Sequence, residues 1–198
     1  QKYFRNVVVV EDGSTDMTYT EAKKSLPAEI LRHPINCGQG TAIKTGIRYF
    51  LDNKHYDYLI TFDGDGQHNV YDAVKMIQFA IDEKKDAVIG SRFLEEDSRR
   101  SLPMSKKTIL RLARLFERVF YGIKLSDAHN GMRVLSRKSC EYLNNLSSSG
   151  MAHATEIPYI LTKKSIYIND FPCSVNYKKH ISKGQPIMNL LNIVSDLI

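Results

Sequence analysis

Short apolar runs alternate with longer amphipathic segments from the start of the chain to about position 92. The runs with the length and β-branched content of buried strands lie at 6–10, 29–32, 58–62 and 87–90. Between them, apolar residues recur at helical spacing after Thr41 and again over 70–84, and a shorter polar helix is expected before Ser25. Strands that alternate with helices predict an α/β fold, with a Rossmann-like, mainly parallel sheet and helices on both faces.

The pattern becomes less regular beyond Arg92. It predicts helices over 104–120, over 137–146 and shortly after 151–156, strands over 132–135, 166–168 and 174–177, and an amphipathic helix over 186–198. No internal repeat and no linker interrupts the 198 residues, which are enough for one domain with a real core. We therefore expect a single domain over 1–198.

Polar side chains follow three of the predicted strands at the point where each strand ends. Asp12 follows the first strand, Asp63 and Asp65 follow the third, and Arg92 follows the fourth. Ligands bind beyond the carboxyl ends of parallel strands, so these side chains are expected to share one site.

Asp63 and Asp65 belong to an Asp-Gly-Asp-Gly-Gln segment. Two carboxylates at a strand end can hold one hard divalent cation, Mg²⁺ or Mn²⁺, together with a substrate phosphate, and Gln67 can add an amide oxygen. The alternative is a solvated acidic turn, because Asp and Gly are common turn residues.

Two further loops carry candidate binding groups. Asp12 lies in an Asp-Gly-Ser-Thr-Asp segment, where it can accept a hydrogen bond from a base N–H or a ribose hydroxyl, although ordinary helix capping explains such residues equally well. The loop over 36–40 precedes a helix and can bind phosphate at the helix N-terminus, or be a simple turn. It lacks the third glycine of a dinucleotide fingerprint and the Lys of a P-loop, which disfavours both classes.

The loop over 127–133 combines an acid, an imidazole and a guanidinium. Asp127 is a candidate general base and Arg133 a candidate anion clamp, whereas His129 is expected to be a solvated loop residue.

The net charge of +6 comes from one place. Lys and Arg total 28 against 22 Asp and Glu, and the window 98–118 alone holds seven basic residues and one acidic residue. A local basic stripe predicts an anionic partner, and the absence of an RNP-like or helix-turn-helix pattern favours a phosphate or lipid surface over nucleic acid. We expect 98–121 to form a basic amphipathic segment on the acceptor or membrane side, in a cytoplasmic protein held at the inner face of the membrane.

Several classes are excluded by what the sequence lacks. The three cysteines have no CxxC spacing, so neither a disulfide framework nor a zinc site is expected and a reducing compartment is the default. No signal peptide is recognisable, and no apolar run reaches the length of a membrane span.

Read together, the motifs resemble the family 2 glycosyltransferases, which have the GT-A fold. Three segments are similar to motifs of the whole family: Val9–Asp16 (V-V-D-D-G-S-T-D), 33–42 (N-x-G-x-G-x-A) and 62–68 (D-x-D-x-Q). Two more resemble elements of the polyprenyl-phosphate sugar transferases, 89–93 (G-S-R) and 130–133 (S-G-F-R), and 183–197 is similar to a C-terminal K-G-Q-x-x-x-N segment of bacterial members. They occur in the family order and span essentially the whole chain.

The resemblance implies an inverting transfer of a sugar from a UDP- or GDP-sugar to a lipid-linked acceptor, polyprenyl phosphate, in cell-envelope glycan synthesis. It implies metal binding by Asp63, Asp65 and Gln67, donor binding by Asp12, Asp16, Gly40, Lys44, Asp63 and Gly64, acceptor binding by Arg92 and Arg133, and catalytic roles for Asp65 and Asp127. A phosphate acceptor is already anionic and needs no base, whereas a glycan hydroxyl would use Asp127.

This chain departs from the family pattern at two places. Glu11 replaces the first Asp of the usual pair, and the family opens with a further strand ending P-x-x-N-E that has no counterpart here. We therefore expect a sheet without its first strand and a donor pocket without one wall.

Two other functions remain as alternatives. A haloacid-dehalogenase-like phosphatase would use Asp63 as nucleophile and Asp65 as acid and base, although here two strand–helix units precede the motif and no later acidic pair stands out. The second alternative is a non-catalytic module that binds an anionic surface.

Overall fold

The computed structural model describes residues 3–25, 29–94, 115 and 117–175, and the structural statements below concern these residues. The elements are β1 (Val8–Glu11), α1 (Thr18–Ser25), β2 (Glu29–Arg32), α2 (Gln39–Asp52), β3 (Tyr58–Thr61), α3 (Val70–Asp82), β4 (Ala87–Ser91), the π-helical turn η1 (Glu117–Tyr121), β5 (Arg133–Ser136), α6 (Arg137–Leu143), α7 (His153–Lys163) and β6 (Ile168–Pro172). This order confirms the α/β class.

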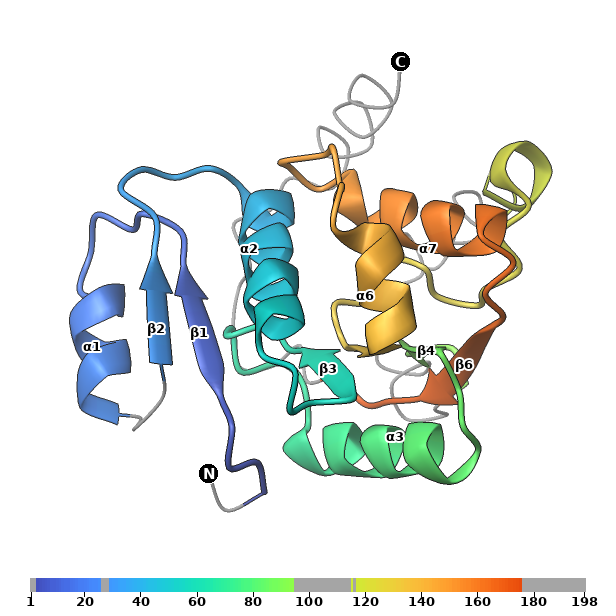
Figure 1. Cartoon of the computed structure of the whole chain (residues 1–198), viewed down its shortest axis with the longest axis horizontal. Coiled ribbons are helices and arrows are strands. Elements are labelled where there is room, and N and C mark those ends of the chain that lie inside the picture. Colours follow the sequence, from blue (N-terminus) through green and yellow to red (C-terminus); the bar gives the residue numbers. More distant parts are fainter. Residues whose placement is uncertain (1–2, 26–28, 95–114, 116, 176–198) are drawn as a thin grey trace.

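The strands form two sheets that lie on either side of helix α2 in Figure 1. β1 and β2 pair in parallel, and the larger sheet has the order β3-β5-β4-β6. β5 runs antiparallel to both β3 and β4, whereas β4 and β6 are parallel. The sheet is therefore mixed rather than mainly parallel, because β5 comes from the less regular part of the chain and inserts between two strands that a helix connects.

Helices cover both faces of the larger sheet, as expected. Helices α2, α6 and α7 lie on one face and α3 on the other (Figure 1). The first side contains Ile47, Phe50, Leu143 and Ile157, and the second contains Met76 of α3, which packs with buried residues of β4 and β5. The alternating apolar pattern thus produces two core layers around one sheet.

The later elements agree less closely with the predictions. β6 covers Ile168–Pro172 instead of 166–168, and the strand predicted over 174–177 is represented by an isolated bridge between Val175 and His68. Most of the predicted basic helix and all of 186–198 lie outside the described residues. Within the described ranges, no helix has both the length and the apolar character needed to cross a bilayer.

The strand directions bring three chain segments to one edge of the larger sheet. β3 and β4 end at this edge, and β5 begins there because it runs the opposite way. Thr61 pairs with Arg133 in the register of β3 and β5, and the Thr61 hydroxyl donates to the Gly131 carbonyl at 2.7 Å. The segments after β3 and β4 and the loop before β5 therefore build one site.

Candidate active site

Asp63 lies at the centre of this edge, two residues after β3. His68 Nε2 lies 3.4 Å from its Oδ2, and Gln39 Nε2 donates to its Oδ1 at 3.2 Å. A Cβ atom on Gly131 would lie 2.0 Å from Asp63 Oδ2, so only glycine at 131 leaves room for the carboxylate. The hydrogen bond to His68 holds the pKa of Asp63 below its usual value against burial, with help from the charge of Arg133. Asp63 is therefore an ionised carboxylate held in one position.

Asp65 lies further out, on the turn that follows. Its side chain is exposed, and its Oδ1 accepts from the Gln67 backbone N–H at 2.9 Å, which closes a tight turn. Gly64 lies between the two carboxylates and lines the cavity described below. The Asp-Gly-Asp-Gly-Gln segment thus presents one anchored carboxylate and one that faces solvent, a donor set that suits a hard cation shared with a ligand.

Arg133 is a fully buried cation next to this acidic segment. Within the described residues its Nε and Nη1 have no hydrogen-bond partner, and Nη2 reaches only the Ala128 carbonyl at 3.5 Å. Burial lowers the pKa of Arg133 to about 10, opposed by Asp63 and Asp127, so the guanidinium stays charged at neutral pH. Buried N–H groups without acceptors are rare in proteins, and here they point to an anionic ligand.

Arg92 and Asp127, also predicted as site residues, are paired with each other. Arg92 Nε and Nη2 donate to Oδ2 and Oδ1 of Asp127, both at 2.6 Å, and the Arg92 backbone N–H donates to Oδ2 at 3.1 Å. Asp127 is 2% exposed. Both oxygens of the Asp127 carboxylate are thus engaged by Arg92.

His153 is a residue of the site that the sequence analysis missed. It is 2% exposed at the start of α7, and its Nδ1 lies 2.8 Å from the Gly150 carbonyl. Burial, followed by the charge of Arg133, lowers the pKa of His153 to about 4, so the imidazole is neutral at pH 7. Its sequence context, a Ser- and Gly-rich stretch, carries no motif that could have identified it.

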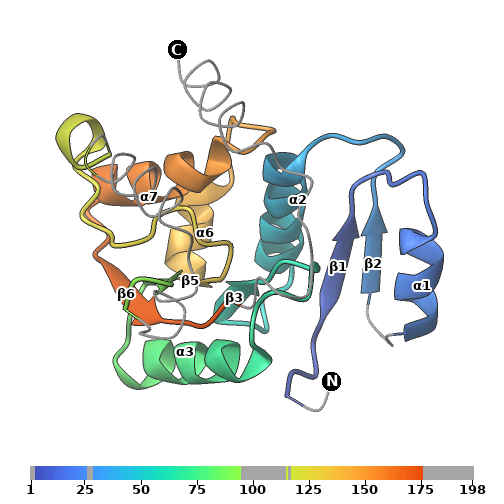
Figure 2. The ribbon, with the colours of Figure 1, turned by 180° about the vertical axis from the view of Figure 1, so that it is seen from behind.

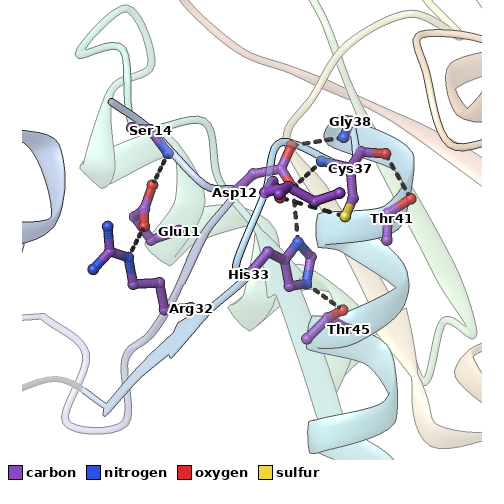
Figure 3. A network of polar contacts seen from close by, with 10 residues as sticks. Glu11, Asp12, Ser14, Arg32, His33, Cys37, Gly38, Thr41 and Thr45 are labelled. Carbon is purple, nitrogen blue, oxygen red and sulfur yellow. Dashed lines mark hydrogen bonds and ion pairs between the residues drawn. The ribbon is translucent and has the colours of Figure 1, made fainter. Parts of the chain in front are cut away.

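Asp12 forms a second polar cluster at the end of β1 (Figure 3). Its Oδ1 accepts from Cys37 N at 2.9 Å and lies 2.7 Å from His33 Nδ1, while its Oδ2 accepts from Gly38 N at 2.7 Å. Burial alone would raise the pKa of Asp12, but the hydrogen bonds from His33 and the two backbone N–H groups lower it overall. Asp12, His33 and Cys37 also form a group that could hold a metal ion, although the contacts of Asp12 are those of a hydrogen-bond acceptor.

Glu11 and Asp16, the other two acidic residues of the 11–16 segment, accept hydrogen bonds from within the protein. Glu11 is buried and accepts from Ser14 N at 2.5 Å and from Arg32 Nε at 2.9 Å, which explains why the longer acid fits where the family has Asp. Asp16 is exposed, and its Oδ1 accepts from Thr18 N at 2.9 Å at the start of α1. The donor-binding role predicted for Asp16 stays a prediction.

Gly40 and Lys44 face protein rather than solvent. Gly40 N and Thr41 N donate to the Ser149 carbonyl at 2.7 and 3.3 Å, and Lys44 Nζ donates to the Leu146 carbonyl at 2.7 Å. A Cβ on Gly40 would lie 2.0 Å from the Ser148 carbonyl oxygen. These contacts account for both residues without a ligand, so we leave them out of the site proposed below.

A cavity of about 540 Å³ separates the two sheets. Its walls include Val8 and Val10 of β1 and Leu59 and Thr61 of β3. Helix α2 contributes a further side, and Gln39, Asp63 and Gly64 also line the cavity. The two polar clusters around Asp12 and Asp63 are thus at the ends of strands that flank one cavity.

The fold and the convergence of these acidic strand ends are those of a nucleotide-sugar transferase, and comparison with known proteins supports that class. The model of glycosyl transferase family 2 matches residues 1–143, and the chain belongs to this family. The fold is GT-A: a glucosyl-3-phosphoglycerate synthase from Mycobacterium tuberculosis, solved with Mn²⁺ and UDP, superposes with a TM-score of 0.70 at 13% identity, over 98% of this chain and 67% of that chain.

Two relatives of described activity align over much of the chain. The UDP-N-acetylglucosamine–dolichyl-phosphate N-acetylglucosaminyltransferase of Methanococcus voltae is 27% identical over 93% of this chain and 80% of its own. The undecaprenyl-phosphate mannosyltransferase of Micrococcus luteus is 30% identical over 65% of this chain, which corresponds to 53% of its own length. Family membership makes this chain a glycosyltransferase and decides against the phosphatase and the non-catalytic module.

Proposed function

We propose that this protein transfers a sugar, with inversion, from a nucleoside-diphosphate sugar to a lipid-linked phosphate acceptor such as polyprenyl phosphate, in cell-envelope glycan synthesis. The observation that carries the proposal is the buried Arg133 guanidinium, whose unused N–H groups lie next to the ionised Asp63. A fixed cation beside a metal-binding carboxylate suits a reaction between two phosphate-bearing substrates. The names of the two relatives, which specify dolichyl and undecaprenyl phosphate, support this acceptor class.

The donor diphosphate is proposed to bind through a divalent cation at the Asp63–Gln67 segment. The ionised Asp63, the exposed Asp65 and the Gln67 amide are hard oxygen donors of the kind that Mg²⁺ and Mn²⁺ prefer. When bound there, such an ion would neutralise the charge that grows on the leaving diphosphate. Mn²⁺ and UDP are the first choices to test, because a solved structure with this fold contains both.

Asp12 is proposed to recognise the nucleoside. Within the described residues Oδ1 already has two donors, whereas Oδ2 has one, from Gly38. A carboxylate oxygen can accept two hydrogen bonds, so Oδ2 keeps one position for a base N–H. The lowered pKa of Asp12 keeps it ionised, and therefore an acceptor only, at neutral pH.

The proposed displacement involves no proton transfer. An acceptor phosphate oxygen attacks the anomeric carbon from the face opposite the diphosphate, and the bond from that carbon to the diphosphate oxygen breaks with its electron pair. Arg133 would hold the acceptor phosphate through Nε and Nη1. Asp127 would hold the Arg92 guanidinium rather than act as a base, because both its oxygens accept from Arg92.

The lipid acceptor implies that the protein works at the inner face of the membrane as a peripheral enzyme. In the described residues Leu115, Arg118 and Val119 are exposed on or beside η1, and six further basic residues of the 98–121 segment lie outside them. Each Lys or Arg near an anionic leaflet contributes on the order of 1 kcal/mol to binding.

Titration calorimetry with UDP tests the donor half of the proposal. We expect binding in the presence of Mn²⁺, weakened at least about tenfold without the metal, because the diphosphate would bind mainly through the ion. Asp65→Ala should abolish the metal-dependent part, whereas the exposed Asp52→Ala, on α2, should leave it unchanged. Equal affinity in wild type and Asp65→Ala, or no binding of UDP or GDP to the wild type, would contradict the proposed site.

A further inference from the structure

His33 connects Asp12, the proposed hydrogen-bond acceptor for the nucleoside, to helix α2. It follows β2 directly, and its backbone N–H donates to the Glu11 carbonyl at 2.9 Å, which places it beside Asp12 at the end of β1. Its Nδ1 lies 2.7 Å from Asp12 Oδ1, and its Nε2 lies 2.9 Å from Thr45 Oγ1 (Figure 3). The two contacted residues come from different elements, so the imidazole bridges them.

The chemistry of the three groups fixes the direction of both hydrogen bonds. An ionised carboxylate can only accept, so the proton of a neutral His33 must be on Nδ1. Nε2 is then an acceptor, and the Thr45 hydroxyl, which can donate, satisfies it. The Asp12 carboxylate thereby sets the tautomer of His33, and the hydrogen bond with Thr45 holds the imidazole in the orientation in which Nδ1 donates to Asp12.

The result is a carboxylate with a single orientation. The His33 and Cys37 donors fill Oδ1, and the Gly38 donor fills one position on Oδ2, so rotation of the Asp12 carboxylate would break all three hydrogen bonds. The side chains of His33 and Asp12 are only 14% and 18% exposed, so water replaces these partners poorly. The remaining Oδ2 position therefore has a fixed direction.

We infer that His33, oriented by Thr45, is a positioning residue that aims Asp12 at a ring N–H of the donor nucleobase and so contributes to base selectivity. The inference rests on the proposed role of Asp12. A merely structural role, fastening β2 to α2, predicts a change in stability alone. A positioning role also predicts a change in selectivity between a base that has the ring N–H and one that lacks it.

The test compares the affinities of UDP and N3-methyl-UDP, with Mn²⁺ present, across matched variants. In wild type we expect UDP to bind at least about tenfold more tightly than the methylated analogue, because the methyl group removes the donor. His33→Leu should bring this ratio close to one. His33→Asn, whose amide can donate from near the Nδ1 position, should keep most of it.

Two variants of Thr45 distinguish a positioning role of His33 from a purely structural one. Thr45→Val should lower the ratio about threefold or more, whereas Thr45→Ser, which keeps the hydroxyl, should not. His55→Leu, at an exposed histidine before β3, serves as a control with an unchanged ratio. If His33→Leu does not fold, the comparison of Thr45→Val with Thr45→Ser tests the positioning role instead.

The outcomes distinguish this inference from the proposed function. A wild type that binds neither UDP nor GDP with Mn²⁺ would contradict the proposed function itself. A wild type that prefers UDP to its N3-methyl analogue, with His33→Leu or Thr45→Val variants that keep the same preference, would overturn the positioning role alone. Loss of thermal stability without loss of selectivity would assign His33 a structural role only.

Discussion

Individual residues in the site depart from what stability alone would select. Arg133 is buried without full hydrogen bonding, although an unsatisfied buried polar group costs about 1–3 kcal/mol and a charged one more. Asp63 is held ionised in a space that only glycine at 131 leaves open. Such groups are retained where a ligand completes their interactions, which is why the proposed chemistry is centred on them.

His153 leads to a prediction about pH. Burial, then Arg133, lowers the pKa of His153 to about 4, whereas an unfolded chain has the usual value of 6.5. Between these values the unfolded state binds more protons, so the free energy of unfolding falls as the pH falls from 6.5 towards 4. The shift corresponds to about 3 kcal/mol over the whole window.

Urea unfolding at pH 7.5 and pH 4.5 measures this effect. His153→Asn keeps a donor for the Gly150 carbonyl and removes the titration, so its stability should differ between the two pH values by about 2 kcal/mol less than that of wild type. The lowered pKa of Glu156 does not depend on His153, so the stability that this carboxylate loses at lower pH is the same in both proteins and cancels in the comparison. The same pH dependence in both proteins would show that His153 is not held neutral by burial.

At the scale of elements, the segment before α7 determines how α2 begins. Glu156 of α7 accepts from Ser147 N at 2.8 Å and Ser148 N at 2.8 Å, and the Ser149 carbonyl then accepts from Gly40 N of α2. This close approach requires glycine at 40. The N-terminus of α2 is thus capped by protein, which is a structural use of the glycines that resembled a phosphate loop.

Two glycine substitutions in α2 should therefore have opposite effects on stability. Gly40→Ala places a Cβ 2.0 Å from the Ser148 carbonyl oxygen and should lower the free energy of unfolding by about 2 kcal/mol. Gly46→Ala meets nothing closer than 3.8 Å and should raise it by about 0.5–1 kcal/mol, because alanine restricts the unfolded chain. Thermal or urea unfolding of the two variants checks the sign, and a stabilising Gly40→Ala would contradict the close packing of the two segments.

The elements with the clearest periodicity were predictable from sequence, and their pairing was not. The apolar runs that became β2, β3 and β4 and the periodic segment that became α3 have nearly the expected boundaries. The antiparallel insertion of β5 between β3 and β4 depends on contacts between distant segments, which local periodicity does not encode.

The same limit applies to the site. The motifs predicted Asp12 and Asp63 as candidates because each follows a strand, and Arg133 because its loop combines acidic and basic groups. They could not show that Arg92 and Asp127 pair with each other, or that the charges of Arg133 and Asp63 act on His153, since these interactions join separate elements. The motifs thus supplied candidate residues, whereas the partners of those residues came from the structure.

At the scale of the whole molecule, a cavity lies between the two sheets. Among the described strands β1 pairs only with β2, and β3 pairs only with β5, so each has one edge without a strand partner (Figure 2).

Hydrogen exchange can test whether these strand edges are open. β4 pairs with a strand on both sides, so its amides should exchange slowly. In β1 and β3, the amides that do not point at β2 or β5 should exchange faster, and these are roughly half of the amides in each strand. Protection of β1 and β3 equal to that of β4 in the 198-residue chain would show that the space is already filled.

The most direct test of the central claim is sugar transfer to polyprenyl phosphate. With Mn²⁺ present, the account predicts that at least one of UDP-glucose, UDP-N-acetylglucosamine and GDP-mannose yields a glycosylated polyprenyl phosphate with inverted anomeric configuration. Arg133→Met should lower this rate by about 100-fold, because the acceptor phosphate loses its buried charged partner, while UDP affinity with Mn²⁺ stays unchanged. No transfer by the wild type from any of these donors, or an undiminished rate in Arg133→Met, would contradict the account.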